Sequence, residues 1–409
     1  MNVLIVNFDF PPNDGIGGRR WAKLAKALAA QGHGVWVIKA DPLPGKAQSP
    51  WTRDVQHPNI HIQSVARAYP LVMQQPVKNV WDKLAYRWAK MQLERSFKGT
   101  IYDISLGWSR SMMQALEATC KRNNIHWILA TGAPWNMLYD LANKVSTDEN
   151  LKLLVDFRDP WINARNYGMA NLSSQRLAWE KHKQLKVLNE ASVVVSPYSH
   201  LTGALRAFAP ESKANFEVLT HFYDKDDLPF SKPNEHSDEI RIVYGGEMYV
   251  ECEPQLQWLS KMLTRLRSEC SEVYQRLRFD FYSPADRSAL FLEHPGVRFH
   301  APVGKKIFLE FQQADGLLLL LTEAKRDDLT TKFFEYLPFH KPLLAMGSNG
   351  AVSDFVNTHT LGHRWSEELT IVQWCEQLNQ LKSYVRKDDL HLENYELEQV
   401  ALQLTAMIQ

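Results

Sequence analysis

The stretch that decides the fold is "NVLIVNFDFPPNDGIGGRRWAKLAKALAAQGHGVWVIKA", residues 2–40. Its apolar start, up to about Phe8, predicts a buried strand, and the segment from about Arg19 has the apolar spacing of an amphipathic helix. Between them lie Gly15, Gly17 and Gly18. Backbone without side chains lets a ligand approach closely, and a helix N-terminus attracts negative charge. The stretch therefore predicts a strand–turn–helix that binds an anion.

The residues around the glycines favour a phosphate group. A dinucleotide fingerprint requires G-x-G-x-x-G, and arginine occupies position 20, where the third glycine would stand. An acid does follow at Asp41, but without the third glycine NAD is a weak interpretation. Arg19 and Arg20 favour phosphate because planar guanidinium groups match phosphoryl oxygens. A glycine turn that binds nothing is the alternative.

Length and composition indicate a globular chain with two cores. The 409 residues are 45% hydrophobic and 23% charged, and this length exceeds what one core commonly spans. "MNVLIVNFDF" lacks a basic segment before its apolar run, so we expect a strand there and not a signal peptide. No run approaches about 20 apolar residues, so we expect no membrane-spanning helix. Four scattered cysteines without metal-ligand spacing favour a reducing cytoplasm.

The net charge of +1 conceals an uneven distribution. Residues 1–100 hold 14 Lys and Arg against 6 Asp and Glu, a net of +8, whereas residues 366–409 hold 3 against 8, a net of −5. A basic front half suits an anionic membrane surface or a phosphorylated lipid, and we expect no nucleic-acid partner. A solvated surface whose charges are balanced elsewhere in the fold explains the same asymmetry.

Short apolar runs alternate with amphipathic helical segments along the whole chain, which is the pattern of parallel sheets covered on both faces. The polar segment at residues 223–239 interrupts this alternation, and "IRIVYGG" restarts it. The sequence therefore predicts an α/β fold of two Rossmann-like doubly wound domains facing across a cleft, with ligands at the carboxyl ends of strands. We expect a first domain at residues 1–223, a linker at 224–239 and a second domain at 240–390. A C-terminal helix at residues 391–409 is expected to pack back towards the first domain.

The expected elements follow from the same periodicity. Strands are predicted at residues 2–7, 34–39, 59–64, 125–130, 151–156 and 192–196, then at 240–244, 277–282, 296–300, 315–321 and 341–346. The predicted helices include residues 19–31, 135–145, 172–190, 254–268, 305–313 and 331–339.

A second candidate site follows the strand in "KLLVDFRDPW", residues 152–161. Asp156, Arg158 and Asp159 stand at its carboxyl end, where polar side chains of this architecture face the ligand crevice. An internal ion pair of Arg158 with either acid is the alternative. The preceding strand ends in "ATGAPWNM", so we expect Trp135 and Asn136 to contact a sugar.

A third candidate site lies in "TEAKRDDLTTKFFEYLPFHKPLLAM", residues 322–346. Thr330 or Thr331 is a candidate N-cap whose neighbouring N–H groups would meet an anion. Lys325, Arg326 and Lys332 add positive charge. Glu335, one turn into the helix, would accept hydrogen bonds from two ribose hydroxyls, because a buried carboxylate needs partners. A Glu335–Lys332 pair at i, i+3 is the alternative.

Taken together, these motifs resemble the bacterial GT-B glycosyltransferases, in particular retaining glycosyltransferase family four and its "DFRDPW" subgroup. The matching stretches are "VLIVNFDFPP…GIGGRRWAKLAKALAAQGHGVWVI", "LATGAPWN", "LLVDFRDPW", "NEASVVVSPYSH" and "LLLL…TTKFFEYLPFHKPLLA". They cover nearly the whole chain in the family's order, and that order is more specific than any single motif.

The resemblance implies transfer of a sugar from a nucleotide diphosphate, bound mainly by the second domain, to a saccharide or lipid-linked acceptor. It implies that Gly17, Gly18 and Arg19 approach the donor phosphates and that Thr331 and Glu335 hold the donor. Gly246 belongs to the corresponding strand end, "YGGEMYVECEP". The expected setting is cytoplasmic synthesis of cell-surface polysaccharide or glycolipid, at the inner face of the membrane.

The chain also departs from the family pattern. The first glutamate of the Glu–seven residues–Glu motif is Asp327, one methylene shorter. The Arg and Lys that often follow the first strand of the second domain are missing from "YGGEMYVECEP", so Lys325, Arg326 or Lys332 would supply the charge. The family's active-site histidine is also missing, and Arg158 and Asp159 stand at the equivalent strand end.

The chemistry implied needs little covalent help. Cationic groups and helix N-termini would stabilise the leaving diphosphate, which could itself accept the acceptor's proton with retention of configuration. We therefore expect no cofactor and no metal, since no ligand cluster is visible. Asp159 would orient the acceptor or the donor sugar, and Arg158 and Asp327 are the other catalytic candidates. A sugar-nucleotide epimerase using some of His221, His294, His300 and His340, or a catalytically silent partner of another transferase, remains the alternative.

Residues 77–99, "VKNVWDKLAYRWAKMQLERSFKG", have the pattern of an amphipathic helix. Trp81, Leu84, Trp88 and Met91 fall on one side, and Lys83, Arg87 and Lys90 share another. Tryptophan flanked by Lys and Arg suits the plane of an anionic membrane. A helix that packs its tryptophans on its own domain explains the pattern equally well.

Overall fold

The computed structural model describes residues 1–13, 15–43, 49–162, 167–229, 238–386 and 390–409. The chain divides into two compact units. The first unit comprises Met1–Thr220 and Ala401–Gln409, and the second comprises His221–Val400. Residues 230–237 of the expected linker lie outside the described part of the chain. Each unit has its own sheet and core.

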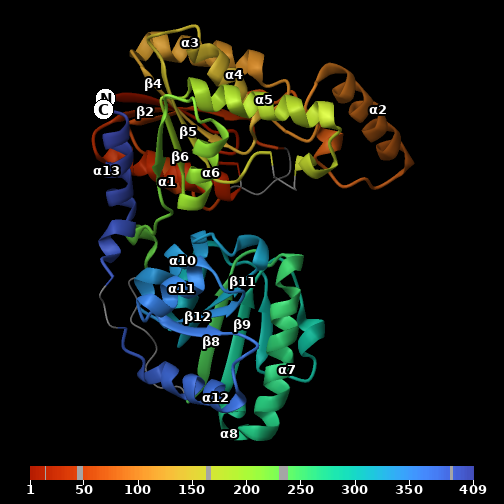
Figure 1. Ribbon diagram of the computed structural model, residues 1–409, viewed down its shortest axis with the longest axis vertical. Coiled ribbons are helices and arrows are strands. Elements are labelled where there is room, and N and C mark those ends of the chain that lie inside the picture. Colours follow the sequence, from red (N-terminus) through yellow and green to blue (C-terminus); the bar gives the residue numbers. More distant parts are fainter. Residues whose placement is uncertain (14, 44–48, 163–166, 230–237, 387–389) are drawn as a thin grey trace. The chain divides into compact units, whose positions relative to one another are not determined.

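The first unit is built on a seven-stranded parallel sheet in the order β3-β2-β1-β4-β5-β6-β7 (Figure 1). Its strands are β1 (Asn2–Val6), β2 (Gly34–Ala40), β3 (Ile60–Val65), β4 (Trp127–Gly132), β5 (Lys152–Phe157), β6 (Val193–Ser196) and β7 (Asn215–Val218). In register, Leu4 of β1 lies between Trp36 and Ile128. The strand order reverses between β1 and β4, so a ligand crevice is expected at the carboxyl ends of these two strands.

Helices cover both faces of this sheet, with α3, α4 and α5 on one face and α1 and α6 on the other (Figure 1). They are α1 (Ile16–Ala30), α2 (Val80–Ser96), α3 (Ser109–Asn123), α4 (Asn136–Val145), α5 (Ser174–Glu190) and α6 (Ser199–Phe208). The last helix, α13 (Leu397–Met407), belongs to this unit from Ala401 onward. There the Thr405 hydroxyl lies 3.0 Å from Oε1 of Gln31, at the end of α1.

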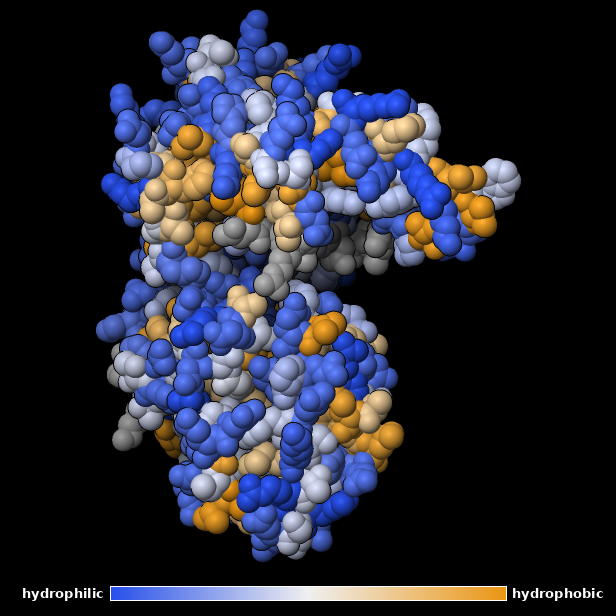
Figure 2. All heavy atoms as spheres, turned by 45° about the vertical axis from the view of Figure 1, so that its right-hand side comes forward, coloured by the Kyte–Doolittle hydropathy of each residue, from blue (hydrophilic) through white to orange (hydrophobic). Residues whose placement is uncertain are grey.

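Helix α2 lies at the margin of the first unit, and Figure 2 shows apolar side chains gathered on this part of the surface. The helix begins after Asn79, whose side chain accepts a hydrogen bond from the backbone N–H of Asp82. Its buried residues are Ala89 and Leu93. Among the described residues, every helix is too short or too polar to cross a membrane.

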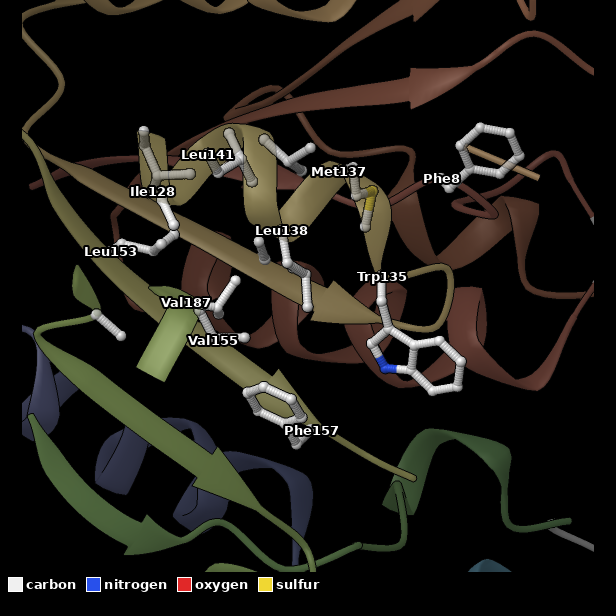
Figure 3. Packing of buried hydrophobic residues seen from close by; sticks show 14 of the residues in the cluster. Phe8, Ile128, Trp135, Met137, Leu138, Leu141, Leu153, Val155, Phe157 and Val187 are labelled. Carbon is white, nitrogen blue, oxygen red and sulfur yellow. The ribbon is translucent and has the colours of Figure 1, made fainter. Parts of the chain in front are cut away.

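A core cluster of the first unit joins the sheet with α3, α4 and α5 and includes Leu201 and Leu205 of α6; Figure 3 shows the part around β4, β5 and α4. Continuous apolar strands are buried on both faces, as parallel sheets require. Each fully buried Leu, Val or Phe contributes about 1.5–3 kcal/mol relative to an exposed one. The labelled members, all at most 1% exposed, are Phe8, Ile128, Trp135, Met137, Leu138, Leu141, Leu153, Val155, Phe157 and Val187.

The second unit repeats the design with a six-stranded parallel sheet in the order β10-β9-β8-β11-β12-β13. Its strands are β8 (Ile240–Gly245), β9 (Leu277–Tyr282), β10 (Val297–His300), β11 (Gly316–Leu321), β12 (Leu343–Gly347) and β13 (Gly362–Trp365). Its helices are α7 (Glu253–Glu269), α8 (Ser271–Arg276), α9 (Ile307–Gln313), α10 (Thr331–Tyr336), α11 (Ala351–Thr358) and α12 (Ile371–Gln380). Leu259, Leu263 and Trp374 pack with the sheet in its core. The strand order reverses between β8 and β11.

The predicted class, two Rossmann-like doubly wound α/β domains, is confirmed by these two sheets. All eleven predicted strands occur, within a few residues of the expected bounds. The sequence prediction missed β7 and β13, each four residues long and at the edge of its sheet. Their sequences, "NFEV" and "GHRW", lack the long apolar run of a central strand.

Candidate functional site

In the first unit, polar groups converge where β1, β4 and β5 end. Arg158 follows β5 directly and its Nε donates to the Thr131 hydroxyl and to the Gly132 carbonyl, both at 3.2 Å. Its Nη2 donates to the carbonyl of Ala133 at 3.4 Å. These bonds fix the guanidinium against the end of β4, beside the point where the strand order reverses.

The glycine loop packs directly against this arginine. A Cβ atom at Gly17 would stand 2.6 Å from both Nη atoms of Arg158, and one at Gly18 would collide with the backbone carbonyl of Asp9. The loop turns into α1 at Gly15, whose φ of +143° disfavours residues with a side chain. Close packing therefore explains the glycines of this loop, and any phosphate contact remains a prediction.

The two arginines after the glycines have different surroundings. Arg20 is 5% exposed and its guanidinium donates to Asp156 Oδ2 at 3.1 Å and to the carbonyls of Leu219 and Thr220 at 2.6 and 2.9 Å. This corrects the expectation that Arg20 meets phosphate, because its donors are spent inside the fold. Arg19 lies 4.2 Å above the ring of Trp51.

Asp156 is also accounted for by the fold. Its carboxylate is fully buried and accepts hydrogen bonds from Arg20 and from the indole N–H of Trp21, the latter at 2.8 Å. The suggested Arg158–Asp156 pair is therefore wrong. Asp159 is half-buried in the loop directly after Arg158 and makes polar interactions there, so its predicted role remains untested.

Asp9 is a candidate that the sequence prediction missed. It follows β1, its Oδ1 lies 3.9 Å from Arg67 Nη2, and 32% of its side chain is exposed. Burial raises the pKa of Asp9, and the charges of Arg67, Arg158 and Lys39 oppose that rise. Burial also lowers the pKa of Lys39 to about 8. A carboxylate held among cations at a switch point suits proton transfer or hydroxyl binding. In the sequence, the position of Asp9 just after the first predicted strand was the signal that could have identified it.

The expectation that Trp135 contacts an acceptor sugar is wrong, and Asn136 has partners within the fold. The Trp135 indole is 0% exposed and stacks on Trp161, with ring centroids 5.9 Å apart (Figure 3 shows Trp135 in the core). The backbone N–H groups of Trp135 and Asn136 donate to Asp103 Oδ2, each at 2.8 Å. The Asn136 side chain bonds Asp140 at 3.2 Å and Lys183 at 3.4 Å. These residues anchor the start of α4.

In the second unit, Lys332 brings positive charge to the end of β8. Its Nζ donates to the carbonyl of Glu247 at 3.1 Å and lies 4.9 Å from the ring centre of Tyr244. Gly246 has φ +126°, and a Cβ atom there would collide with the lysine side chain. Burial lowers the pKa of Lys332 to about 8. The lysine thus reaches the carboxyl end of β8.

The remaining donor candidates lie on α10 and in the loop before it. Thr330 holds the N-cap position of α10, which spans Thr331–Tyr336 and continues as a 3₁₀ turn. Glu335 is half-buried on the same helix as Lys332 and has polar partners. Tyr336, fully buried, accepts from the backbone N–H of Gly245 at 3.1 Å and so ties α10 to the end of β8.

The loop after β11 is more open. Lys325 lies 3.2 Å from Asp328, and Arg326 lies 2.9 Å from Glu323 and 3.8 Å from Asp327. The side chains of Lys325, Arg326 and Asp327 are 50%, 52% and 65% exposed. Three acids stand against two cations at residues 322–330, a net of −1, so the loop supplies no net positive charge of its own.

A cavity of about 240 Å³ opens further along the same edge of the second sheet, where β12 and β13 end. Gln255 of α7 contributes to its wall and donates to the carbonyl of Leu321 at 2.9 Å. The other lining residues are Pro254, Trp258, Met346, Gly347, Ser348, Trp365, Ser366 and Glu367. No motif marked this cavity, because it forms from segments about ninety residues apart.

Two of the candidate histidines have structural surroundings. His300 lies 2.7 Å from Asp280, which also pairs with Arg241, and His294 bonds Tyr274 at 3.0 Å. Within the described ranges, no three His, Cys, Asp or Glu side chains gather as a metal site would require. The expectation of a reaction without metal or cofactor stays a prediction.

Solved structures with the same fold were found although no protein family model and no curated protein matches the sequence. Sucrose-phosphate synthase from Thermosynechococcus elongatus has a TM-score of 0.62 at 13% identity, with 100% of this chain and 98% of that chain covered. An E. coli structure described as trehalose-6-phosphate with bound UDP-2-fluoro glucose gives 0.61 at 11% identity, covering 100% and 99%. WaaG, a glycosyltransferase involved in lipopolysaccharide biosynthesis, gives 0.57 at 12% identity, covering 98% and 99%. Two parallel sheets with flanking helices, matched over full length, establish the GT-B fold for this chain.

Proposed function

We propose that this protein is a glycosyltransferase that moves a sugar from a nucleotide diphosphate to a saccharide or lipid-linked acceptor. The GT-B fold supports this proposal, since the similar chains include a glycosyltransferase and a sucrose-phosphate synthase. Fold alone does not give function, so the proposal rests on the site as well.

The observation that carries the proposal is the position of Lys332 beside Gly246. The ammonium group lies at the end of β8, next to the switch point. It is proposed to stabilise the charge of a leaving diphosphate. Glu335 extends from the same helix and is proposed to bind the donor ribose. Asp327 is proposed to contact the donor sugar from the exposed loop before the helix.

On the first unit, Arg158 and Asp159 are proposed to orient the acceptor or the donor sugar, with Asp9 beside them. The reaction is proposed to retain the anomeric configuration, with the leaving phosphate accepting the acceptor's proton. The pathway is proposed to be cell-surface polysaccharide or glycolipid synthesis, as the lipopolysaccharide role of WaaG suggests.

Donor turnover tests the proposal. Nucleoside diphosphates are screened by thermal shift, and the matching nucleotide sugars are then assayed for release of free nucleoside diphosphate with and without acceptor. A glycosyltransferase releases the diphosphate in an acceptor-dependent way, whereas an epimerase returns an isomeric nucleotide sugar. A protein that binds no nucleotide and turns over no donor would overturn the proposal.

Glu335→Ala tests the donor side. Loss of two hydrogen bonds to a carboxylate is expected to weaken nucleoside diphosphate binding about tenfold or more. Calorimetry measures the affinity, with the exposed Glu368→Ala on the same unit as the matched control. Unchanged affinity in Glu335→Ala would remove the ribose role.

A further inference from the structure

Helix α2 has two apolar faces, and only one of them is buried. Ala89 and Leu93 face the first unit, where Leu93 packs with Tyr69 and Ile101. On a helical wheel Ala89 and Leu93 lie within about 40° of each other, roughly opposite Leu84 and Met91. The tryptophan-bearing side of the helix therefore points away from the fold.

The outward side forms the α2 apolar stripe, defined as Val80, Trp81, Leu84, Trp88 and Met91. Their exposed fractions are 68%, 78%, 51%, 64% and 38%. This excludes the interpretation in which the helix packs its tryptophans on its own domain. Leu71 and Val77, 45% and 41% exposed, precede the helix in the chain. A contiguous apolar surface of this kind marks an interaction site.

The helix is firmly attached, so the stripe is presented from a fixed position. Arg176 of α5 donates to the carbonyls of Glu94, Phe97 and Gly99 at 2.8, 3.1 and 2.7 Å. Asn79 caps the other end of the helix. The C-terminal end of α2 is therefore held against α5 while the apolar side of the helix stays uncovered.

Cationic side chains border the stripe along one side. Lys83, Arg87 and Lys90 follow one another at spacings of four and three residues, which places them along one side of the helix. Residues 77–99 contain six Lys and Arg against two Asp and Glu. Lys90 lies 3.8 Å from Glu94, an exposed pair that neutralises little of this charge.

We propose that α2 is a membrane-docking surface that inserts the α2 apolar stripe into the headgroup region of an anionic lipid bilayer. Tryptophan, leucine and methionine suit the interfacial depth, and Lys and Arg meet lipid phosphates beside it. A second copy of this chain fits less well. A two-fold contact would bring like-charged helices together, and five side chains fall short of the roughly 20–30 residues per partner of a stable interface.

This surface is independent of the proposed reaction, because it needs neither donor nor acceptor. A membrane position would suit a lipid-linked acceptor, but docking and transfer can each fail alone. The experiment therefore measures vesicle binding by the full chain without substrates, and nucleoside diphosphate binding is followed separately.

The test is co-sedimentation with two kinds of vesicle. One is a mixture of phosphatidylglycerol and phosphatidylcholine, and the other is phosphatidylcholine alone. The parent protein is expected to bind the anionic vesicles and to bind neutral ones about tenfold or more weakly, with affinity falling as salt rises. Trp81→Ser with Trp88→Ser is expected to lower anionic binding about tenfold or more. Lys83→Gln with Arg87→Gln is expected to remove the preference for anionic lipid.

Matched controls separate this surface from general stickiness. Leu292→Ser with Val385→Ser removes two apolar side chains, each 84% exposed, from the second unit and should leave binding unchanged. Hydrogen exchange should show slower exchange at residues 80–96 when anionic vesicles are added. A parent that binds no anionic vesicle, or a double tryptophan variant that binds as tightly as the parent, overturns the proposal. Dimerisation that the tryptophan variant abolishes, without vesicle binding, overturns it in favour of a second copy.

Discussion

Gly17 and Gly18 are neighbours in sequence, but different atoms exclude a side chain at each. At Gly17 the obstacle is the far end of the Arg158 side chain, which can move, whereas at Gly18 it is the backbone of Asp9, which cannot move without shifting the strand connection. Arg158, in turn, is held by the end of β4. A motif that suggested phosphate binding is thus also a packing motif.

This difference predicts unequal costs for alanine at the two positions. Gly18→Ala is expected to destabilise the protein by about 1–3 kcal/mol through overpacking. Gly17→Ala should cost less, because displacing the end of the Arg158 side chain sacrifices its hydrogen bonds to the end of β4 but requires no shift of the backbone. Urea unfolding of both variants measures the difference. Equal free energies of unfolding would contradict the packing account.

Lys332 gives a prediction on pH. Its pKa is lowered to about 8 by burial, so the ammonium form is lost as the pH rises through 8. If it binds diphosphate, nucleoside diphosphate affinity should fall by up to about tenfold per pH unit above pH 8, where the ligand's own phosphates are already ionised. Lys332→Met should bind weakly and show a flat profile over the same range. Calorimetry between pH 7.5 and 9.5 checks this, and a flat parent profile would contradict it.

At the scale of elements, α2 and α4 start in different ways. Helix α2 is capped by its own Asn79, whereas the N–H groups that begin α4 are bound by Asp103, which comes from a segment 32 residues away. Asp103 is 1% exposed and its Oδ1 also accepts from the backbone N–H of Ser105 at 2.9 Å. The α4 start therefore depends on tertiary structure.

Removing these caps should have different consequences. Asp103→Ala leaves two N–H groups unsatisfied next to the core and is expected to cost roughly 3 kcal/mol of global stability. Asn79→Ala is expected to cost about 1 kcal/mol or less, mostly as fraying of α2. Urea unfolding measures the first, and hydrogen exchange at the start of α2 the second. A comparable loss of global stability in Asp103→Ala and Asn79→Ala would contradict the expected difference between the two caps.

These elements also show what the sequence can and cannot predict. Central strands such as β1 and β11 were predictable, because burial on both faces requires an unbroken apolar run. Edge strands β7 and β13 were not, because half-covered strands need no such run. The loops predicted to form the site do follow strands, and their catalytic role stays a prediction. Trp135 was misassigned, since apolar residues at a strand end can equally face the core. Asp103 was missed because its partners are distant in sequence.

At the scale of the whole molecule, each of the two units has its own cluster of buried side chains. Leu138 belongs to the first core and Leu344 to the second, and both are fully buried. The residues of each core come from one unit. The two units should therefore respond separately to mutation.

Paired core substitutions test this separation. Leu138→Ala and Leu344→Ala should each cost about 2–5 kcal/mol, with each lowering one of two calorimetric transitions. Nucleoside diphosphate should raise the transition that Leu344→Ala lowers, because ligand stabilises the unit that binds it. A single transition that both variants lower equally would contradict independent units.

The order of the chain through the two units has a consequence for biogenesis. The first unit is interrupted after Thr220 and resumes at Ala401, where Thr405 meets Gln31. During translation the inserted half can fold as soon as it leaves the ribosome. The part made earlier is expected to stay incomplete until the nine residues Ala401–Gln409 of its unit emerge. Nascent chains stalled before residue 401 should therefore bind chaperones through the first unit, which is synthesised first, and not through the second unit.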